Sequence, residues 1–432
     1  MTGIEDDSAC DGAVRKAFRH VLPWCVAFYI VAYLDRINVG FAALTMNKDL
    51  GLTATMFGLS GTLFYLVYVG FEAPSTLMLA RFGARFWLPR IMITWGLASM
   101  ATVFAVGAYS FYGLRMLVGL AEAGLTPGVL FYLSRWFPRD RRAQANSLFL
   151  ASLPLALITG APLSGAILQM NGWLGLAGWR WVFLLEGVPP IVLGVIALMV
   201  LPNGPQDASW LEAGERAALI GRLEREGARE TPAKGAVWST LANPRILALS
   251  AVYFCIQATL NTVGLWTPQI VKEVVGPASG TLSVSLISAV PPVLSIAAMV
   301  WAAQDADRRG RQAAHVVVAL ALGGVGWTTV ALGATPLVKL AGLSLAFCGD
   351  YAAICVFWAA ITRLVPGPNQ AAAIGVVSTL GTTASIVSPY IIGSLKDLTH
   401  SFNASAWYVA VLLFIGSLAM AAISRRAGAR PC

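Results

Sequence analysis

Charged residues are scarce in this chain of 432 residues. Asp, Glu, Lys and Arg make up only 12% of it, whereas hydrophobic residues make up 57%. A soluble domain usually carries about 25% charged residues, so the composition excludes a cytosolic globular protein, a disordered protein and a secreted disulfide scaffold. It is typical of a chain that crosses a membrane many times.

Residues that build metal, redox and hydrolytic centres are also few. The six cysteines form no CxxC pair, and the three histidines are scattered along the chain. The sequence contains no GxSxG, HExxH or GxxxxGK[ST] pattern, which are the signatures of a nucleophile elbow, a zinc protease and a nucleotide-binding loop. We therefore expect no cofactor, no bound metal and no enzymatic activity.

Long apolar stretches dominate what is present. A spanning helix needs about 20 mostly apolar residues, and this criterion predicts twelve helices in two sets of six, at residues 20–43, 55–80, 91–109, 112–134, 145–169 and 179–201, and at 246–271, 281–303, 313–333, 337–362, 372–395 and 404–424. The predicted fold class is all-α membrane protein, with two pseudo-symmetric six-helix bundles. The predicted domains are residues 1–201, a cytoplasmic linker at 202–245, and residues 246–432.

The linker is the only long polar stretch. Its segment Ser209–Glu212 has the spacing of a capping box and predicts the start of a surface helix. The net charge of +9 comes mainly from arginine clusters between apolar stretches, such as Arg81–Arg90 and Arg135–Arg142. This pattern indicates cytoplasmic loops rather than nucleic-acid binding, and it places both termini in the cytoplasm.

Several ionisable residues fall inside the predicted helices, where a charge is costly and indicates a functional site. Asp35 and Arg36 are adjacent and therefore point about 100° apart. Arg115 and Glu122 are two turns apart on one face. A buried carboxylate can exchange a proton, and a buried arginine can bind a carboxylate, so the set suits proton-coupled binding of an organic anion. Alternatively, these charges neutralise one another. Asp350 either faces the cavity or pairs with another helix.

Polar and aromatic side chains on the same helices are further candidates. Tyr33, Tyr68 and Trp358 lie on apolar backgrounds, and two pairs are one helical turn apart: Gln257 with Asn261, and Ser378 with Thr382. Such residues line a substrate site or hold helices together by hydrogen bonds, and both interpretations stay open. They come from both halves, as a site at the membrane midplane requires.

The whole chain resembles the major facilitator superfamily and, within it, the anion:cation symporter family. The resemblance lies in Tyr33-Leu-Asp-Arg-Ile-Asn-Val-Gly-Phe-Ala42, Phe71-Glu-Ala-Pro-Ser75, Gly83-Ala-Arg-Phe-Trp-Leu-Pro-Arg90, Gly119-Leu-Ala-Glu-Ala-Gly124, Trp136-Phe-Pro138 and Phe183-Leu-Leu-Glu-Gly187. It is strongest for the bacterial subgroup of tartrate, phthalate and hydroxyphenylacetate transporters.

This resemblance implies proton-driven uptake of an organic anion. It assigns proton coupling to Asp35 and Glu122, and substrate binding to Arg36 and Arg115. It also implies that Tyr33, Tyr68 and Trp358 surround the substrate. The turn with Asp307, Arg308, Gly310 and Arg311 is similar to the superfamily's cytoplasmic gate motif, and Arg81, Gly83 and Arg85 form its first-half copy, with Ala80 in place of the aspartate.

The sequence departs from the family in its second half. Ser378 and Thr382 replace two asparagines, Cys355-Val356 replaces a Pro-Pro pair, and Asn261 replaces a tyrosine. Asp350 and Arg363 are additions. Because these changes cluster in the half expected to set specificity, we do not infer the substrate of this protein from that of any relative.

The expected function is therefore proton symport of a small organic carboxylate by alternating access, with Na⁺ left open as coupling ion. The alternatives are a proton-antiport exporter of drugs or organic cations, and a non-transporting sensor of organic acids with the same fold. The expected location is the bacterial inner membrane. The expected partners are the organic anion, the proton and the lipid bilayer, with no nucleic acid, and the expected state is a monomer.

Overall fold

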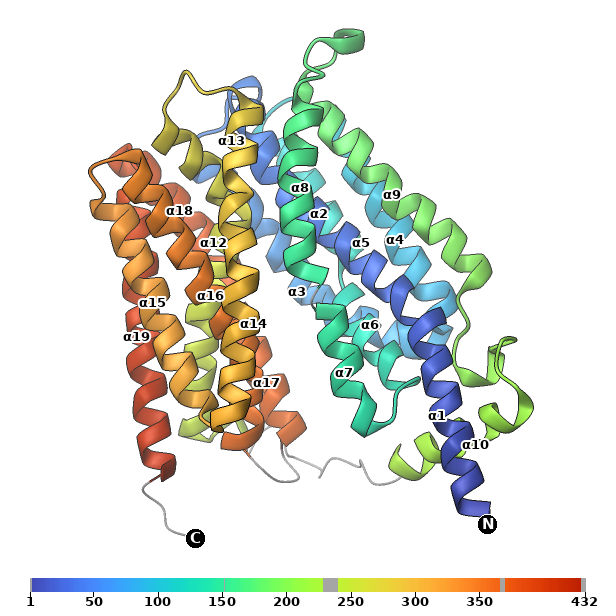
Figure 1. Ribbon diagram of the computed structural model, residues 1–432. Helices are drawn as coiled ribbons and strands as arrows, with labels where there is room; N and C mark the ends of the chain where they lie inside the picture. The colour runs from blue at the N-terminus through green and yellow to red at the C-terminus, as the bar shows by residue number, and fades with distance from the viewer. Residues whose placement is uncertain (1, 151, 228–239, 366–369, 429–432) are drawn as a thin grey trace. The chain divides into compact units, whose positions relative to one another are not determined.

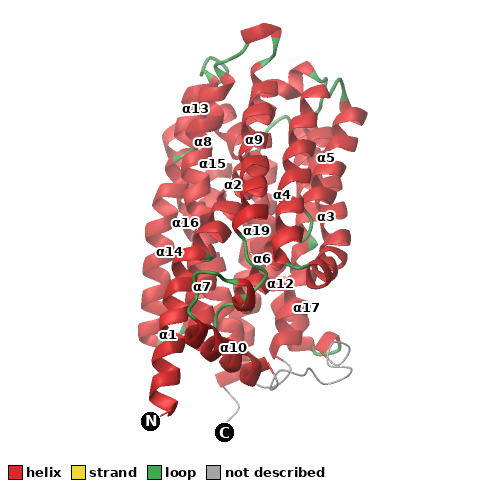
Figure 2. Ribbon diagram, turned by 90° about the vertical axis from the view of Figure 1, so that its right-hand side faces the viewer, coloured by secondary structure: helices red, strands yellow, loops and turns green. Residues whose placement is uncertain are grey.

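The computed structural model describes residues 2–150, 152–227, 240–365 and 370–428. These residues form helices and connecting turns, with no strand among them (Figure 2). In the described residues ten helical segments are long and apolar enough to cross a membrane: Ser8–Asp49, Ala54–Phe82, Ala108–Ser134, Gly178–Val200, Pro244–Val275, Thr281–Arg309, Gln312–Leu332, Pro336–Leu364, Ala372–Thr399 and Asn403–Arg425.

The chain divides into two compact units, and neither is continuous in sequence. The first comprises Met1–Asp35, Leu63–Ala156 and Arg180–Thr231, and the second comprises Arg36–Thr62, Leu157–Trp179 and Pro232–Cys432. Segments 36–62 and 157–179, from the predicted first domain, thus have most of their contacts with the second unit. The predicted domain boundaries stay a prediction.

In the described residues, the first unit contains nine helices wholly or in part, together with residues 152–156 at the start of a tenth. These are α1 (Thr2–His20), α2 (Leu22–Asp49), α3 (Ala54–Phe82), α4 (Ala84–Ala101), α5 (Ala108–Glu122), α6 (Leu125–Ser134), α7 (Arg139–Leu150), α9 (Gly178–Val200) and α10 (Ala213–Gly227), with short 3₁₀ turns at Thr102–Phe104 and Pro205–Asp207 (Figure 1). Large aromatic side chains such as Phe28, Trp95 and Trp136 form its core and are fully buried.

The start of the predicted linker packs on this unit. The Tyr132 hydroxyl donates to the Pro202 carbonyl at 2.7 Å, and Trp210 stacks on Trp136 with ring centroids 5.3 Å apart. The surface helix expected in the linker is present as α10, and residues 228–239 lie outside the described part. However, Ser209 does not cap it: α10 begins at Ala213, and Glu215 accepts the Glu212 N–H at 3.1 Å.

An ion pair holds α10 against α1. Lys16 donates to Glu215 at 2.7 Å. Burial alone would raise the pKa of Glu215. The hydrogen bonds from Lys16 and from the Glu212 N–H, with the charges of Lys16 and Arg15, outweigh burial and lower the pKa below its ordinary value of 4.5. Glu215 is therefore ionised at neutral pH and stabilises the docked helix.

The second unit contains most of α8, α12 to α19, residues 36–49 of α2, residues 54–62 of α3 and the first two residues of α9. The new bounds are α8 (Ser152–Leu168), α12 (Pro244–Val275), α13 (Thr281–Ser288), α14 (Val290–Arg309), α15 (Gln312–Leu332), α16 (Pro336–Leu364), α17 (Gln370–Thr382), α18 (Ala384–Thr399) and α19 (Asn403–Gly428), with a 3₁₀ turn at Trp173–Gly175. Helix α15 packs on α16 and α19 (Figure 1). Glycines allow this approach: a Cβ on Gly326 would lie 2.3 Å from the Ala346 nitrogen.

Within the second unit, the beginning of α3 is tied to α18. The Asp397 carboxylate accepts the N–H groups of Ala54 at 3.0 Å and Thr55 at 2.7 Å. One turn further on, Gly58 lies against the α18 backbone, where a Cβ would be 2.2 Å from the Pro389 carbonyl oxygen. The Thr62 hydroxyl donates to the Ile386 carbonyl at 2.6 Å. A carboxylate cap and a close backbone approach thus fix α3 on α18.

Two predicted helices differ in position from the observed ones. The helix predicted at 91–109 is α4, which begins at Ala84 and therefore includes basic residues assigned to the preceding loop. Within α4, the Arg85 Nε donates to the Leu198 carbonyl at 3.1 Å, and the Arg90 guanidinium carbon lies 4.0 Å from the Trp87 ring centroid. The helix predicted at 145–169 is described as α7 and α8.

Three predicted helices are interrupted. The helix predicted at 112–134 is divided into α5 and α6 at Ala123 and Gly124, and Gly124 has a left-handed φ of 88°. Pro127 explains the break, because proline has no N–H to donate to the Ala123 carbonyl and its ring collides with that group. Pro291 and Pro292 likewise follow the break between α13 and α14. The third interruption lies at Thr383 between α17 and α18, and no proline lies within five residues of it.

Candidate functional site

Asp35 is held by two donors from α4. Its side chain is 2% exposed; the Trp95 indole Nε1 donates to one carboxylate oxygen at 2.9 Å, and the Ser99 hydroxyl donates to the other through a short hydrogen bond. Both donors are neutral. They fix the orientation of the carboxyl group.

Arg115 and Glu122 lie two turns apart on α5, and both are buried, with exposed fractions of 5% and 0%. The guanidinium carbon of Arg115 lies 4.5 Å from the ring centroid of Phe64 on α3, which is a cation–π contact. An arginine keeps its charge when buried. Among the described residues, the first unit therefore buries the charge of Arg115 together with three carboxyl groups, those of Asp35, Glu122 and Glu186.

The break in the helix comes directly after Glu122. Glu122 is the last residue of α5, Ala123 is non-helical, and α6 begins at Leu125. Helix ends have backbone N–H and C=O groups without partners inside the helix, and broken helices in transporters place such groups at binding sites. Glu122 was predicted as a site residue, but this break was not predicted.

The aromatic rings of Tyr65 and Tyr68 lie against Phe64 in the first unit. The predicted site residue Tyr68 is buried, and its ring lies 5.9 Å from that of Phe64. Tyr33 is half-buried and packs edge-on against Tyr29 at 4.9 Å. Phe64 was missed by sequence reasoning, because its role follows from its contact with Arg115 and not from its own chemistry.

Some predicted site residues of the second unit form hydrogen bonds with one another. The Asn261 side chain donates to the Gln257 carbonyl and to the Ser385 hydroxyl, both at 2.7 Å. The Thr382 hydroxyl donates to the Ser378 carbonyl at 2.8 Å. The expected role in holding helices together is therefore observed for Asn261, which links α12 to α18. Substrate contact by Gln257, Asn261, Ser378 and Thr382 stays a prediction.

Trp358 and Arg36 also belong to the second unit, and both are half-buried. The Trp358 ring packs edge-on against Tyr253 with centroids 4.8 Å apart, which joins α16 to α12. Arg36 follows Asp35 directly on α2, although contacts assign the two residues to different units. Tyr253 and Ser385 are neighbours that the sequence did not single out.

Asp350 lies where α15 meets α16. It is 1% exposed, and a Cβ on Gly323 of α15 would come within 2.8 Å of its carboxylate. A small apolar pocket of about 20 Å³ in the same unit is lined by residues that include Phe347 and Val263 but not Asp350. The structure thus places Asp350 in a helix contact.

Each of the two basic turns contains a glycine with a positive φ. Gly83 has φ 82° and precedes α4, where Asn203 accepts the Arg85 N–H at 3.0 Å; Arg81 is exposed beside the Phe82 ring. Gly310 has φ 64° and ends α14. These φ values favour glycine because other residues adopt them at a cost.

The second turn has additional contacts. Arg363 of α16 donates to the Gly310 carbonyl at 3.1 Å, and Gln312 donates to Asp307 at 3.2 Å. Arg308 and Arg311 are exposed. The sequence marked Arg363 as an addition to the family pattern, and the structure shows that it contacts the turn.

Comparisons with known proteins match the chain to one family along most of its length. The family model described as "Major Facilitator Superfamily" matches residues 25–389. A protein of Agrobacterium vitis named "Putative tartrate transporter" is 42% identical over 96% of this chain and 95% of its own length. A "Quinolone resistance transporter" of Acinetobacter baumannii is 32% identical over 94% of each chain.

The fold agrees with solved structures. The crystal structure of a bacterial homologue of the human lysosomal transporter Spinster, in an inward-facing and unoccupied conformation, superposes with a TM-score of 0.78. Sequence identity is 15%, and the match covers 94% of this chain and 97% of the other. At this identity the likeness concerns the fold alone.

Proposed function

Because the chain belongs to the Major Facilitator Superfamily, we propose that this multi-pass membrane protein imports a small organic carboxylate together with protons, by alternating access. It acts in the bacterial inner membrane as a monomer with cytoplasmic termini. It uses no cofactor, catalyses no reaction and binds no nucleic acid. The observation that carries the proposal is the buried set of Arg115, Glu122 and Asp35 in one unit.

The chemistry of this set favours an anionic substrate. Arg115 presents a planar fork of donors that matches a carboxylate, and a buried positive charge disfavours an organic cation. The relative named for tartrate, at 42% identity, supports the same substrate class. Arg36 is the second candidate anchor for the carboxylate.

Glu122 and Asp35 then supply the coupling. In the empty transporter their ionised forms are balanced by the arginines. Protonation of the two carboxyl groups makes the guanidinium of Arg115 available to the substrate carboxylate. The loaded site is charge-compensated, and this compensation permits the change of access. The basic turns at Gly83 and Gly310 act as the cytoplasmic gate.

The test uses purified protein in proteoliposomes with a panel of hydroxy, aromatic and dicarboxylic acids. We expect a pH gradient to drive accumulation of one acid class, unchanged when choline replaces Na⁺. Arg115→Ala abolishes binding, measured as loss of the acid-dependent rise in melting temperature. Glu122→Gln keeps binding and exchange but loses accumulation. Arg19→Ala and Glu224→Gln, at exposed positions, are the matched controls.

One result contradicts the coupling scheme directly: accumulation against a gradient by Glu122→Gln. A second candidate function, drug export by proton antiport, is favoured by the relative named for quinolone resistance. It predicts that lipophilic cations, and no acid, raise the melting temperature. A sensor would bind an acid through Arg115 without any accumulation by the wild-type protein.

A further inference from the structure

Two titratable side chains join α14 to α15, at a place that the proposed transport scheme does not use. The His315 Nε2 lies 2.8 Å from one oxygen of the Asp305 carboxylate, across the turn between the two helices. Asp305 lies one helical turn before the end of α14, and His315 lies in the first turn of α15. Most of each side chain is buried, with exposed fractions of 15% for His315 and 19% for Asp305.

Both ring nitrogens of His315 face groups that accept hydrogen bonds. Nδ1 lies 2.9 Å from the Arg311 carbonyl oxygen, and Nε2 faces the Asp305 carboxylate. A neutral imidazole has one N–H and one bare nitrogen, so it can donate to only one of these acceptors. The imidazolium ion has an N–H on each nitrogen and donates to both. The observed geometry therefore fits the protonated ring.

The Asp305 carboxylate accepts on both of its oxygens. The second oxygen accepts from the Arg309 Nε at 2.9 Å. An ionised carboxylate has acceptors on both oxygens and no donor, and a cation at each oxygen favours this form. The contact between His315 and Asp305 is thus an ion pair whose proton is on the histidine.

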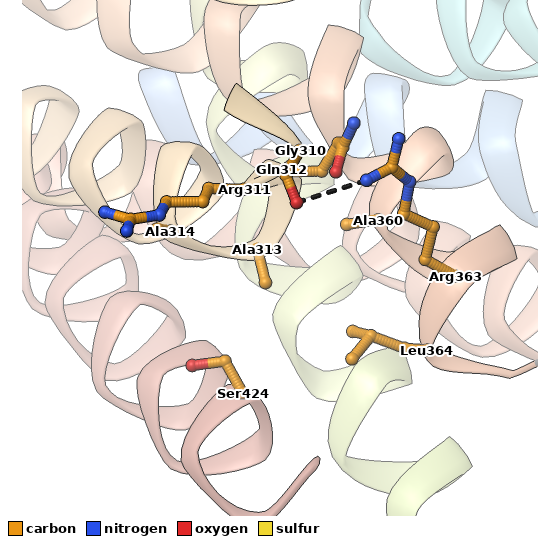
Figure 3. A pocket seen from close by; sticks show the side chains of 9 residues that line it. All are labelled: Gly310, Arg311, Gln312, Ala313, Ala314, Ala360, Arg363, Leu364 and Ser424. Atoms are coloured by element: carbon orange, nitrogen blue, oxygen red, sulfur yellow. Dashed lines mark hydrogen bonds between the residues drawn. The ribbon is translucent and has the colours of Figure 1, made fainter. Parts of the chain in front are cut away.

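The other charged groups around the turn have different contacts. Arg363 of α16 donates to the Gly310 carbonyl, and the Arg311 side chain points away from Arg363 (Figure 3). Among the described residues, the ion pairs of the two side chains are those of Asp305 with His315 and with Arg309. The remaining charged residues near the turn are bound elsewhere or exposed: Asp307, Arg308, Arg311, Arg363 and, on α19, Arg425.

We propose that His315 and Asp305 form a pH-sensitive link, which ties α15 to α14 when His315 is protonated and opens when His315 is neutral. Histidine is the side chain that ordinarily changes its charge between about pH 5 and 8. Because both side chains are partly exposed, protons reach the ring from solvent. The ion pair therefore stabilises the turn at the lower pH, and this contribution is lost as the pH rises.

The link acts on the turn that it spans. Asp305 and His315 flank Gly310, which the proposed function assigns to the cytoplasmic gate. The regulatory meaning of the link rests on that proposed function, whereas the link itself does not. Under that function, the gate becomes stiffer as the cytoplasm becomes more acidic, and proton-driven import changes the cytoplasmic pH in this direction.

The experiment measures hydrogen exchange by mass spectrometry on the full-length protein in detergent, without substrate, at about pH 5.5 and about pH 8. Peptides that cover residues 300–320 report on the link, after correction for the intrinsic effect of pH on amide exchange. The variants are His315→Gln and Asp305→Asn. His400→Asn is the matched control, because His400 is exposed at the end of α18 and has a positive φ that asparagine adopts readily.

We expect exchange in these peptides of the wild type to be about three- to tenfold slower at the lower pH, as for a part-buried ion pair with a charged hydrogen bond. Exchange is equal at the two pH values in His315→Gln and in Asp305→Asn, because neither variant forms the ion pair. His400→Asn keeps the difference seen in the wild type.

The proposal is overturned if the wild type shows no difference between the two pH values, or if His315→Gln keeps the difference. Should His315→Gln fail to fold, Asp305→Asn decides, because it keeps the histidine and removes only the charge of its partner. The measurement uses no substrate and no gradient. A protein that imports no acid can therefore still show the link, and a working symporter without the pH difference refutes the link alone.

Discussion

The contact between Gly58 and α18 predicts that replacing glycine by alanine has opposite effects on stability at two positions of α3. Alanine at position 58 would place its Cβ 2.2 Å from the Pro389 carbonyl oxygen and 2.9 Å from the Pro389 carbonyl carbon. Both atoms belong to backbone, so no side-chain rotation relieves the overlap. The backbones must move apart by about 1.2 Å to reach 3.4 Å, where a Cβ contact becomes ordinary.

The magnitude follows from two opposing effects. Overpacking of a close contact costs about 1–3 kcal/mol, whereas replacing glycine by alanine inside a helix gains about 0.5–1 kcal/mol. At Gly58 the overlap outweighs the gain, and we expect a net loss of stability of about 1–2 kcal/mol. At Gly70, also on α3, a Cβ would meet nothing within 4 Å. Gly70→Ala should therefore stabilise the protein, by up to about 1 kcal/mol.

The assay is thermal unfolding of the purified wild type, Gly58→Ala and Gly70→Ala in one detergent. We expect the melting temperature to fall for Gly58→Ala and to rise for Gly70→Ala. Because helix and substitution are the same, differences in propensity or expression do not explain opposite signs. If both variants have a raised melting temperature, α3 does not pack on α18 as described.

Two further predictions concern charges at helix ends. Asp397→Ala should lower stability by about 1 kcal/mol, as for the loss of an N-cap, and it should be non-additive with Gly58→Ala because both act on the α3–α18 contact; thermal unfolding of the single and double variants measures this. For Glu215, whose pKa is lowered by Lys16 and the Glu212 N–H, stability is present above the unfolded pKa and is lost as pH falls through the folded value. Glu215→Gln should therefore speed hydrogen exchange in α10 at pH 7, within about tenfold for a part-buried pair, and should approach the wild type only when the pH falls below the lowered folded pKa of Glu215; equal exchange at pH 7 would contradict it.

Much of the fold could be predicted from the sequence, because crossing a membrane imposes a strong local constraint. Each spanning segment needs a long apolar stretch, so ten of the twelve predicted helices correspond to segments of the described residues that are long and apolar enough to span. The burial of Asp35, Arg115 and Glu122 was predictable for the same reason. Their position inside apolar stretches leaves few alternatives to burial or to pairing.

The interruptions of the helices were predictable in principle but were not predicted. Gly124 and Pro127 follow Glu122 within five residues, and glycine with a nearby proline is a signal for a helix end. The apolar stretch continues through both residues, so a criterion based on hydropathy predicts one uninterrupted helix. The consequence concerns function, because Glu122 lies at a helix end rather than in mid-helix.

The attachment of α3 to α18 had no local signal. Asp397 lies 342 and 343 residues from the N–H groups that it caps, and nothing near it in sequence marks it as a helix cap. Helix α3 also has a cap of its own, because the Thr53 hydroxyl accepts the Met56 N–H at 3.2 Å. The N–H groups of the first turn are thus shared between a local and a remote acceptor. If Asp397 withdraws, Thr53 still caps the helix, and the N–H groups of Ala54 and Thr55 at the helix end can turn to water. The cost of separating α3 from α18 is then limited to the contacts of that interface, such as those of Gly58 and Thr62.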